Sequence, residues 1–552
     1  MSAQITFLLQ KSLEQLQVGN LSQAEDFVKK GLAIQPKNFD CLHIFGVIKS
    51  LQGNFEDAVQ ALRSAVEIKK NDFGVQFNLA KALMELGSYS ESLVHHRKAI
   101  NLNPANVDCL VNYAKSLKEL DQSAEALTVY DKALKLNSAD FEIWTYKGIV
   151  LNELGRHDDA LQAFDNSLRI HPNFLSAIFS KGVTFFDLEN YDQAIIQYER
   201  FLAVDSANQL VWLNKGQAHH ELRQYEKALE AYRRAYELNP NLHDAVFLES
   251  LTALTLGDME NGLKKFEARF LKTNAPAYLH PEILPVITLD QVCGKTVLVW
   301  EEEGFGDAIQ FSRYISRLLS LGAKVIFETR PELARLFGYI DGITVIERGQ
   351  QYGGVDFQIP LQSLPHLFGE RVATIPNADG YLAVPNMLVQ QWSNLLCLGK
   401  DRLNIGVATF MNPKYINSPI SKKIMPLSLL EPLLQKANLF VLQKSIPESD
   451  RGFADKHPEI QYLGDEIQDF ADSAAIIESM DLIISVDTSI AHLAGALGKK
   501  TFILLASSAD WRWFLDDNKS PWYAKAKLFR QKTTGNWGDP INDICSELKI
   551  NF

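Results

Sequence analysis

The sequence predicts a chain of two architectures: an α-helical repeat solenoid over residues 1–270, followed by an α/β part with two Rossmann-like lobes. Three observations lead to this prediction. Small residues recur every 34 positions in the first half, and this helical periodicity stops near residue 271. Beyond that point, short apolar runs alternate with glycine-bearing turns and helical stretches, which is typical of a parallel sheet.

The composition limits the classes of function. A chain of 552 residues is too long for one hydrophobic core, so several domains are expected. The net charge of −12 argues against a nucleic-acid-binding protein. The five cysteines lie far apart without a CxxC pair, which favours reduced thiols and predicts no metal site. Because we see no basic leader and no long apolar run, we expect a cytoplasmic protein without a signal peptide or transmembrane segment.

Three columns of small residues define the repeat, because small side chains let paired helices approach closely. The columns run through Ala24, Ala58, Ala126, Ala160, Ala194 and Ala228, through Gly46, Ala80, Ala114, Gly148, Gly182, Gly216 and Ser250, and through Ala65, Ala99, Ala133, Ser167 and Ala235. The pattern resembles the tetratricopeptide repeat, in about eight copies from residue 5 to 270. The eighth copy departs from it, with Arg269 in place of the usual small residue.

Such repeats coil into a superhelix whose concave surface generally binds peptides or proteins. Asn78, Asn112 and Asn214 occupy the same place in the first helix of their repeats. They resemble the inner-face asparagine ladder of the eukaryotic O-linked N-acetylglucosamine transferase, whose amides can donate to and accept from a peptide backbone. The resemblance makes them candidate acceptor-binding residues. The alternative is that asparagine is simply common at this place in the repeat.

The pattern of the second half predicts a linker followed by two lobes. Residues 271–291 carry several prolines and form the predicted linker. The first lobe, 292–385, has predicted strands at 296–300, 324–327, 344–346 and 356–360 and a helix over 308–319. The second lobe, 400–552, has predicted strands at 404–408, 439–442, 482–486 and 501–505. Ligands of such sheets lie beyond the carboxyl ends of the strands.

The turn at Asp487, Thr488 and Ser489 follows a buried strand and opens a helix over 490–497. It brings together a carboxylate, two hydroxyls and free backbone N–H groups, and a helix N-terminus with such groups can bind an anion. The alternative interpretation is that Thr488 or Ser489 only caps the helix.

Five blocks of the second half match a known family in order. They are WEEEGFGDAIQFSRYI (Trp300 to Ile315), FVLQK (Phe440 to Lys444), GDEIQDFADSAA (Gly464 to Ala475), SVDTSIAHLAGALG (Ser485 to Gly498) and DWRWFLDDNKSPWY (Asp510 to Tyr523). On these blocks, residues 291–535 resemble bacterial glycosyltransferase family nine, the ADP-heptose:lipopolysaccharide heptosyltransferase relatives, and especially its branch with N-terminal tetratricopeptide repeats. The resemblance implies the two-lobed GT-B fold and sugar transfer from a nucleotide-sugar to an acceptor hydroxyl.

The family match implies roles for the first-lobe loop. Asp307 matches the family's catalytic aspartate and would deprotonate the acceptor, a step typically worth about 10² to 10⁴ in rate. Gly304 and Gly306 would clear space for the acceptor. The alternative for Asp307 is a helix N-cap.

The second lobe would hold the donor. The resemblance implies that Asp487 binds sugar hydroxyls and that Thr488 and Ser489 contact the diphosphate, while His492 is either a donor contact or a structural residue. The remaining candidate donor-binding residues are Gln443, Lys444, Asn412, Lys414 and Asp472. No DxD triplet occurs in the sequence, which is consistent with transfer without a metal or other cofactor.

The sequence also departs from the family after the first strand of the second lobe. Phe410 and Met411 stand where the repeat-bearing branch usually has a small Ala-Gly pair, so a bulky side chain lies where the backbone would approach phosphate.

Taken together, the repeats and the family resemblance predict an inverting, metal-independent glycosyltransferase whose repeats present a protein acceptor, or a glycan or lipopolysaccharide precursor. The alternative is a non-catalytic repeat scaffold with a degenerate transferase domain that binds partners or a nucleotide.

Overall fold

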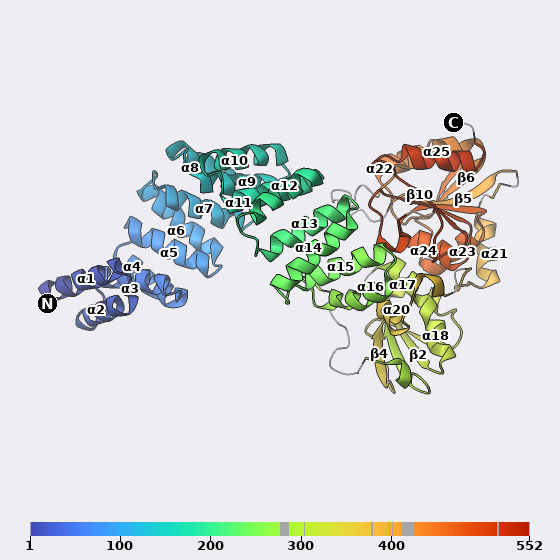
Figure 1. Ribbon diagram of the computed structural model, residues 1–552, viewed down its shortest axis with the longest axis horizontal. Coiled ribbons are helices and arrows are strands. Elements are labelled where there is room, and N and C mark those ends of the chain that lie inside the picture. Colours follow the sequence, from blue (N-terminus) through green and yellow to red (C-terminus); the bar gives the residue numbers. More distant parts are fainter. Residues whose placement is uncertain are drawn as a thin grey trace. The chain divides into compact units, whose positions relative to one another are not determined.

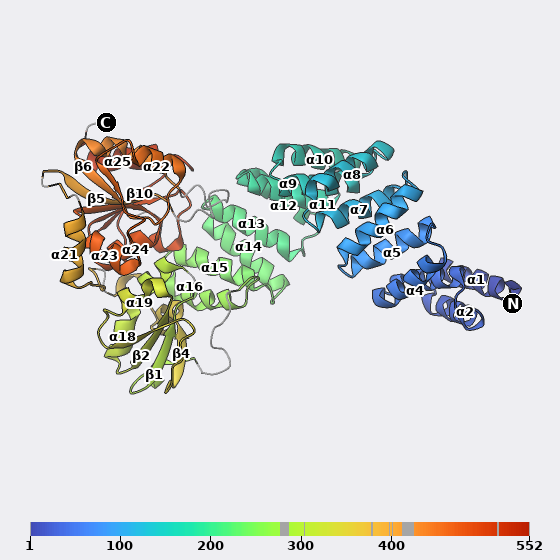
Figure 2. The ribbon, with the colours of Figure 1, turned by 180° about the vertical axis from the view of Figure 1, so that it is seen from behind.

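The computed structural model describes residues 2–275, 286–302, 304–376, 379–396, 398–399, 401–410, 424–515 and 518–550 (Figures 1 and 2). The chain divides into two compact units, residues 1–218 and 219–552, which are described separately. The division falls inside helix α13 (Gln209–Glu221), so the last repeats belong to the same unit as the α/β part.

The first unit consists of helices packed against their neighbours in sequence, such as α9 on α10 and α5 on α6. The helices before α13 are α1 (Ser2–Gln17), α2 (Leu21–Ile34), α3 (Phe39–Leu51), α4 (Phe55–Ile68), α5 (Phe73–Glu85), α6 (Tyr89–Leu102), α7 (Val107–Lys118), α8 (Ser123–Leu136), α9 (Phe141–Glu153), α10 (His157–Ile170), α11 (Leu175–Asp187) and α12 (Tyr191–Leu202). They confirm the predicted helical solenoid of repeats.

Two features with the 34-residue period explain this local structure. Asn38, Asp72, Asn106 and Asp140 each accept a hydrogen bond from a backbone N–H three residues further on, and so cap the first helices of their repeats. The small residues mark the places where helices touch. A Cβ atom on Gly182 would lie 2.6 Å from the Tyr198 ring, which is itself buried.

The second unit begins with the last repeat helices, α14 (Tyr225–Leu238), α15 (His243–Thr255), α16 (Met259–Phe266) and the 3₁₀ turn η1 (Glu267–Phe270). Helix α15 packs against η9 (Trp511–Trp513) of the second lobe, and α16 packs against α20 (Leu364–Leu367) of the first. The rings of Phe266 and Trp511 lie 6.3 Å apart. The last repeat therefore packs against both lobes.

The first lobe contains a parallel four-stranded sheet in the order β3-β2-β1-β4, and all four strands fall where the sequence predicts them. They are β1 (Thr296–Trp300), β2 (Lys324–Thr329), β3 (Ile343–Glu347) and β4 (Phe357–Pro360), with the helix α19 (Pro331–Phe337) and the 3₁₀ turns η2 (Leu289–Gln291), η4 (Leu361–Ser363) and η5 (Val372–Thr374).

The segment 308–319 is helical as predicted, but it is not one continuous α-helix. The segment forms α17 (Phe305–Phe311), η3 (Ser312–Tyr314) and α18 (Ile315–Ser320). The break has a local cause, because Tyr381 Oη donates to the carbonyls of Ile309 and Gln310 and Arg313 Nε donates to that of Gln310. Side chains thus occupy carbonyls that would otherwise serve the helix.

The second lobe contains a parallel six-stranded sheet in the order β10-β9-β8-β5-β6-β7. Its strands are β5 (Leu403–Ala408), β6 (Ala437–Val441), β7 (Ile460–Tyr462), β8 (Leu482–Val486), β9 (Thr501–Leu505) and β10 (Ala526–Arg530). Its helices are α21 (Asn386–Leu395), η8 (Leu427–Gln435), α22 (Glu448–Ala454), α23 (Phe470–Glu478), α24 (Ser489–Ala496) and α25 (Gly538–Glu547). The strand order turns back between β5 and β8, which is where ligands of open parallel sheets bind.

No helix within the described ranges is long and apolar enough to cross a bilayer.

The helix contact at Gly182 yields a prediction about the first unit. Replacing Gly182 by Val should destabilise this unit by about 1–3 kcal/mol, because the added carbons overlap the buried Tyr198 ring. Urea unfolding followed by circular dichroism measures the change. Gln162→Val on the exposed face of α10 is the matched control, and equal destabilisation by both variants would contradict the packing argument.

Candidate functional site

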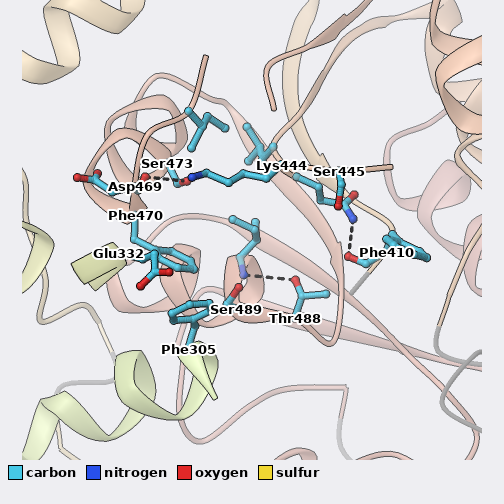
Figure 3. Close-up of a pocket in the computed structure, with 14 residues that line it drawn as sticks. Phe305, Glu332, Phe410, Lys444, Ser445, Asp469, Phe470, Ser473, Thr488 and Ser489 are labelled. Atoms are coloured by element: carbon cyan, nitrogen blue, oxygen red, sulfur yellow. Dashed lines mark hydrogen bonds between the residues drawn. The ribbon is translucent and has the colours of Figure 1, made fainter. Parts of the chain in front are cut away.

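A cavity of about 290 Å³ lies between the two lobes, and we name it the interlobe cavity (Figure 3). The second lobe lines it with residues that follow β5, β6 and β8, among them the predicted residues Gln443, Lys444, Thr488 and Ser489. Phe305 and Glu332 of the first lobe close the other side. Four of the predicted donor-binding residues therefore meet in one cavity at the carboxyl ends of the strands.

The hydroxyls at the start of α24 are half-buried. Thr488 Oγ1 accepts from the Ile490 backbone N–H at 3.3 Å and lies 3.0 Å from Ser485 Oγ. Thr488 thus caps the helix, as the alternative interpretation has it, and it also lines the interlobe cavity. Ser489 is the first residue of α24 and lines the same cavity.

Gln443 holds the end of β5 in place, and Lys444 binds a neighbouring loop. Gln443 Oε1 accepts from the Thr409 backbone N–H at 2.7 Å, and Nε2 donates to the Phe410 carbonyl. Lys444 is exposed, and its Nζ donates to the Gln468 carbonyl at 2.6 Å. Gln443 therefore fixes the residue that departs from the family pattern, while the Lys444 ammonium sits at the cavity edge.

Asp472 joins the lobes and is not among the residues that line the interlobe cavity. Its Oδ1 accepts from Arg335 of the first lobe at 2.5 Å and from Trp392 Nε1 at 3.1 Å. Its Oδ2 accepts from the Gln468 backbone N–H. These contacts occupy the carboxylate, so Asp472 holds the two lobes together. Asn412 and Lys414 lie outside the described residues.

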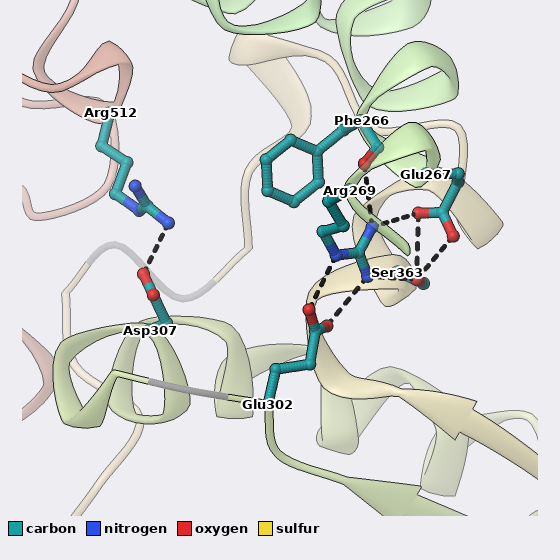
Figure 4. A network of polar contacts seen from close by, with 7 residues as sticks. All are labelled: Phe266, Glu267, Arg269, Glu302, Asp307, Ser363 and Arg512. Atoms are coloured by element: carbon teal, nitrogen blue, oxygen red, sulfur yellow. Dashed lines mark hydrogen bonds and ion pairs between the residues drawn. The ribbon is translucent and has the colours of Figure 1, made fainter. Parts of the chain in front are cut away.

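A second cavity, of about 480 Å³, lies where the last repeat meets the two lobes, and we name it the junction cavity. Asp307 lines it together with Glu302 of the same lobe, Arg269 of the last repeat and Arg512 of the second lobe. Arg512 Nη2 donates to Asp307 Oδ1 at 2.5 Å (Figure 4), and Arg512 Nη1 donates to Asp510 Oδ1 at 2.7 Å.

Asp307 has the electrostatics of a proton acceptor. Burial raises its pKa to about 6, against the opposing charge of Arg512 and with the help of the nearby carboxylates of Asp510, Glu302 and Asp487. The side chain still exposes 29% of its surface. A carboxylate with a pKa just below neutrality is mostly ionised at pH 7 yet accepts a proton readily, which suits a general base.

The glycines beside Asp307 have local packing reasons. Gly304 has a φ of +97°, and a Cβ atom there would lie 2.6 Å from Asp307 Oδ2. A Cβ atom on Gly306 would lie 2.8 Å from Cδ2 of His492 in α24. The space beside each glycine is thus filled by a side chain of the protein, where the family match had implied room for the acceptor.

His492 is built into the contact between the lobes. Its side chain is 6% exposed, its ring stacks on Trp513, and its Nδ1 lies 2.8 Å from Tyr523 Oη. Burial lowers its pKa to about 3, so the ring is neutral at pH 7. Its Nε2 lies 3.8 Å from Oδ1 of the half-buried Asp487. This environment favours the structural interpretation of His492.

The three asparagines belong to the first unit. Asn78, Asn112 and Asn214 are half-buried on α5, α7 and α13. Asn78 Nδ2 lies 2.9 Å from His43 Nε2. The acceptor-binding role of these residues stays a prediction.

The sequence interpretation missed the arginines that hold the loop before Asp307. Arg330 Nε donates to Glu301 Oε1 at 2.8 Å. Arg348 donates to the carbonyls of Glu301 and Glu302 at 2.9 and 3.0 Å. Arg269 binds the Glu302 carboxylate (Figure 4). Of these three arginines, only Arg269 could have been noticed in the sequence, because it is a large cation at a repeat position that is usually small.

The described part of the chain contains no group of three or more His, Cys, Asp or Glu side chains that could hold a metal ion.

The family model that matches this chain is one of tetratricopeptide repeats. It matches residues 114–173 and 179–243, which confirms that the first half contains tetratricopeptide repeats. The protein FlbA of Caulobacter vibrioides is 22% identical over 332 residues, which cover 55% of this chain and 54% of FlbA. This chain thus spans about half the length of FlbA.

Two solved structures are also similar. A tetratricopeptide-repeat protein from Parabacteroides merdae is 19% identical with a TM-score of 0.39, over 45% of this chain and 99% of that one. YrrB, a tetratricopeptide-repeat protein with an unusual peptide-binding site, is 22% identical with a TM-score of 0.30, over 35% of this chain and 100% of its own.

The raised pKa of Asp307 predicts a pH-dependent effect on stability. The folded protein holds this proton to about pH 6, whereas the unfolded chain releases it near pH 3.9. Stability from this group is therefore full below about pH 4 and is lost as the pH rises to 6. The melting temperature of Asp307→Asn minus that of the wild type should be more positive at pH 7.5 than at pH 4.5. The exposed Asp465→Asn is the control, and a difference that does not change with pH would contradict the shift.

Proposed function

We propose that the α/β part is a sugar transferase of the GT-B type, that it takes a nucleotide-sugar donor in the interlobe cavity, and that Asp307 is its base. One observation carries the proposal. The loop before and within α17 contributes Phe305 to the interlobe cavity and Glu302 and Asp307 to the junction cavity. A donor on one side of this loop and an acceptor on the other would bring the two reactants to Asp307.

The interlobe cavity suits the diphosphate of such a donor. The N-terminus of α24 opens into it with Thr488 and Ser489, and the Lys444 ammonium lies at its edge. A helix N-terminus and a cation both favour the charge that develops on a leaving diphosphate. The donor is a substrate, and the proposed reaction uses no metal or other cofactor.

The junction cavity suits an acceptor hydroxyl. The last repeat supplies the apolar wall with Phe247, Leu251 and Phe266, and Asp307 faces the same space. We propose that the repeats present a protein acceptor there, because stacked repeats are generally used to bind polypeptides. A glycan or lipopolysaccharide precursor is the alternative acceptor.

A non-catalytic scaffold is the second candidate, and two observations favour it. Phe410 is 2% exposed and lines the interlobe cavity. The cavity's volume of about 290 Å³ lies at the lower limit of ligand pockets, which measure roughly 300–1,000 Å³. In this alternative the repeats bind partners and the α/β part is a degenerate transferase.

Donor binding can be tested with a thermal-shift panel of UDP-, GDP-, ADP-, TDP- and CMP-sugars. One nucleotide class should raise the melting temperature of the wild type, because a ligand at a hundredfold excess over its Kd stabilises the native state by about 2.7 kcal/mol. Ser489→Trp fills the interlobe cavity and should abolish this shift. Ser546→Trp on the exposed face of α25 is the matched control. If no nucleotide-sugar raises the melting temperature of the wild type, the proposed donor site is contradicted and the scaffold alternative is favoured.

Catalysis by Asp307 predicts a separate result. With the stabilising nucleotide-sugar, Asp307→Asn should keep donor binding and slow sugar transfer or donor hydrolysis by about 10² to 10⁴, because the variant lacks the base. Product release is measured by chromatography, with the exposed Asp465→Asn as the control. Donor binding without turnover in the wild type would favour the scaffold, and equal turnover in both proteins would exclude Asp307 as the base.

A further inference from the structure

Arg269 is the one feature of the last repeat that breaks the repeat pattern and also reaches the candidate site. Its column holds Ala65, Ala99 and Ala133 in earlier repeats. Arg269 itself lies in η1 and exposes 3% of its surface. A buried arginine is costly unless every part of it is paired, so its partners show what it does.

All three guanidinium nitrogens of Arg269 are bonded (Figure 4). Nε and Nη2 donate to the two carboxylate oxygens of Glu302 at 2.7 and 2.8 Å. Nη2 also donates to Ser363 Oγ at 2.7 Å, and Nη1 donates to Glu267 Oε1 at 2.8 Å. The guanidinium lies over the ring of Phe270, 4.2 Å from its centroid. This two-point geometry fixes the position of Glu302 as well as its charge.

Glu302 connects this pair to Asp307. The Glu302 side chain exposes 3% of its surface, and its cation in the described structure is Arg269. Glu302 lies five positions before Asp307, and both side chains line the junction cavity. The segment between them contains Gly304, which has a left-handed φ and opens α17 without a side-chain cap. The Glu302 carboxylate therefore anchors the chain to the last repeat five positions before the candidate base.

We propose that Arg269 is a positioning residue, through which the last repeat fixes the loop that carries Asp307. The effect on catalysis rests on the proposed role of Asp307 as the base, whereas the effect on the loop does not. In this arrangement the last turn of the repeats holds the first-lobe loop together with Arg330 and Arg348 of the lobe itself.

Charge gives the proposal a second consequence. The charged groups that act on Asp307 are Arg512 of the second lobe, Glu302 of its own lobe, and Asp510 and Asp487. Arg269 neutralises Glu302. Without Arg269, the uncompensated Glu302 carboxylate would repel a negative charge on Asp307 and raise the pKa of Asp307 further. Replacing Glu302 by Gln removes that repulsion.

The loop is tested first, by amide hydrogen exchange of the full-length protein followed by mass spectrometry. Arg269→Met should increase exchange in peptides that cover residues 300–311 by about tenfold, because the anchor is lost. Arg317→Met is the matched control, since Arg317 of the same lobe pairs with the buried Glu370 at 2.8 Å. The double variant Arg269→Met with Glu302→Gln leaves no buried charge unpaired. It takes the place of the single variant in the exchange experiment if the single variant does not fold. Unchanged exchange of residues 300–311 in both Arg269 variants would overturn the proposal, whatever the protein's activity.

The pH profile is tested second, with the donor turnover described above. A base works in its ionised form, so the rate falls below its pKa. In Arg269→Met this acid limb should move up by roughly half a pH unit or more, and in the double variant it should return toward the wild-type position. If the acid limb of the pH–rate profile has the same position in Arg269→Met as in the wild type, the proposed effect of Arg269 on the charge near Asp307 is overturned. If the wild type turns over no donor while exchange rises as expected, the positioning role is supported and the proposed function fails.

Discussion

The close contact between α17 and α24 determines where the candidate site forms. The two helices belong to different lobes, and each begins at the carboxyl end of a strand, β1 for α17 and β8 for α24. Because Gly306 has no side chain, the His492 ring packs directly against its backbone. A larger residue at position 306 would push the helices apart. The loop of Asp307 and the turn of Thr488 therefore meet through a contact that only glycine permits.

Arginines connect the parts of the second unit at the points where function is proposed. Arg335 joins the first lobe to Asp472, Arg512 joins the second lobe to Asp307, and Arg269 joins the last repeat to Glu302. A guanidinium suits these positions better than an ammonium because its planar fork binds two oxygens in a fixed geometry. The chain is acidic overall, yet its site is organised by these few cations, of which Arg269 and Arg512 are buried.

Much of the architecture could be predicted from the sequence, since it depends on local patterns. The 34-residue period identified the repeats, and apolar runs identified eight of the strands, such as β1 and β8. The edge strands β7 (Ile460–Tyr462) and β10 (Ala526–Arg530) were missed, since β7 has three residues and β10 carries Lys527 and Arg530. Edge strands face water on one side, so their sequences lack the continuous apolar run of a central strand.

The site was predictable only in part. Gln443, Thr488 and Ser489 meet in one cavity because the ends of parallel strands share one edge of a sheet, which is a general rule. The partners of Asp307 and Asp472 come from segments 205 and 137 positions away in the chain. No local pattern marks such pairs, and so neither arginine partner was predicted from the sequence.

Because the last repeats pack against the two lobes, they limit where the chain can be divided to join it to another solenoid. A cut at residue 270, where the sequence pattern changes, would separate α14, α15 and α16 from the lobes they pack against and would expose the carboxylate of Glu302. A cut near residue 218 leaves that packing whole. Gene fusions that exchange solenoids between proteins of this build should therefore keep the final repeats with the α/β part, and the exchangeable module is the earlier set of repeats.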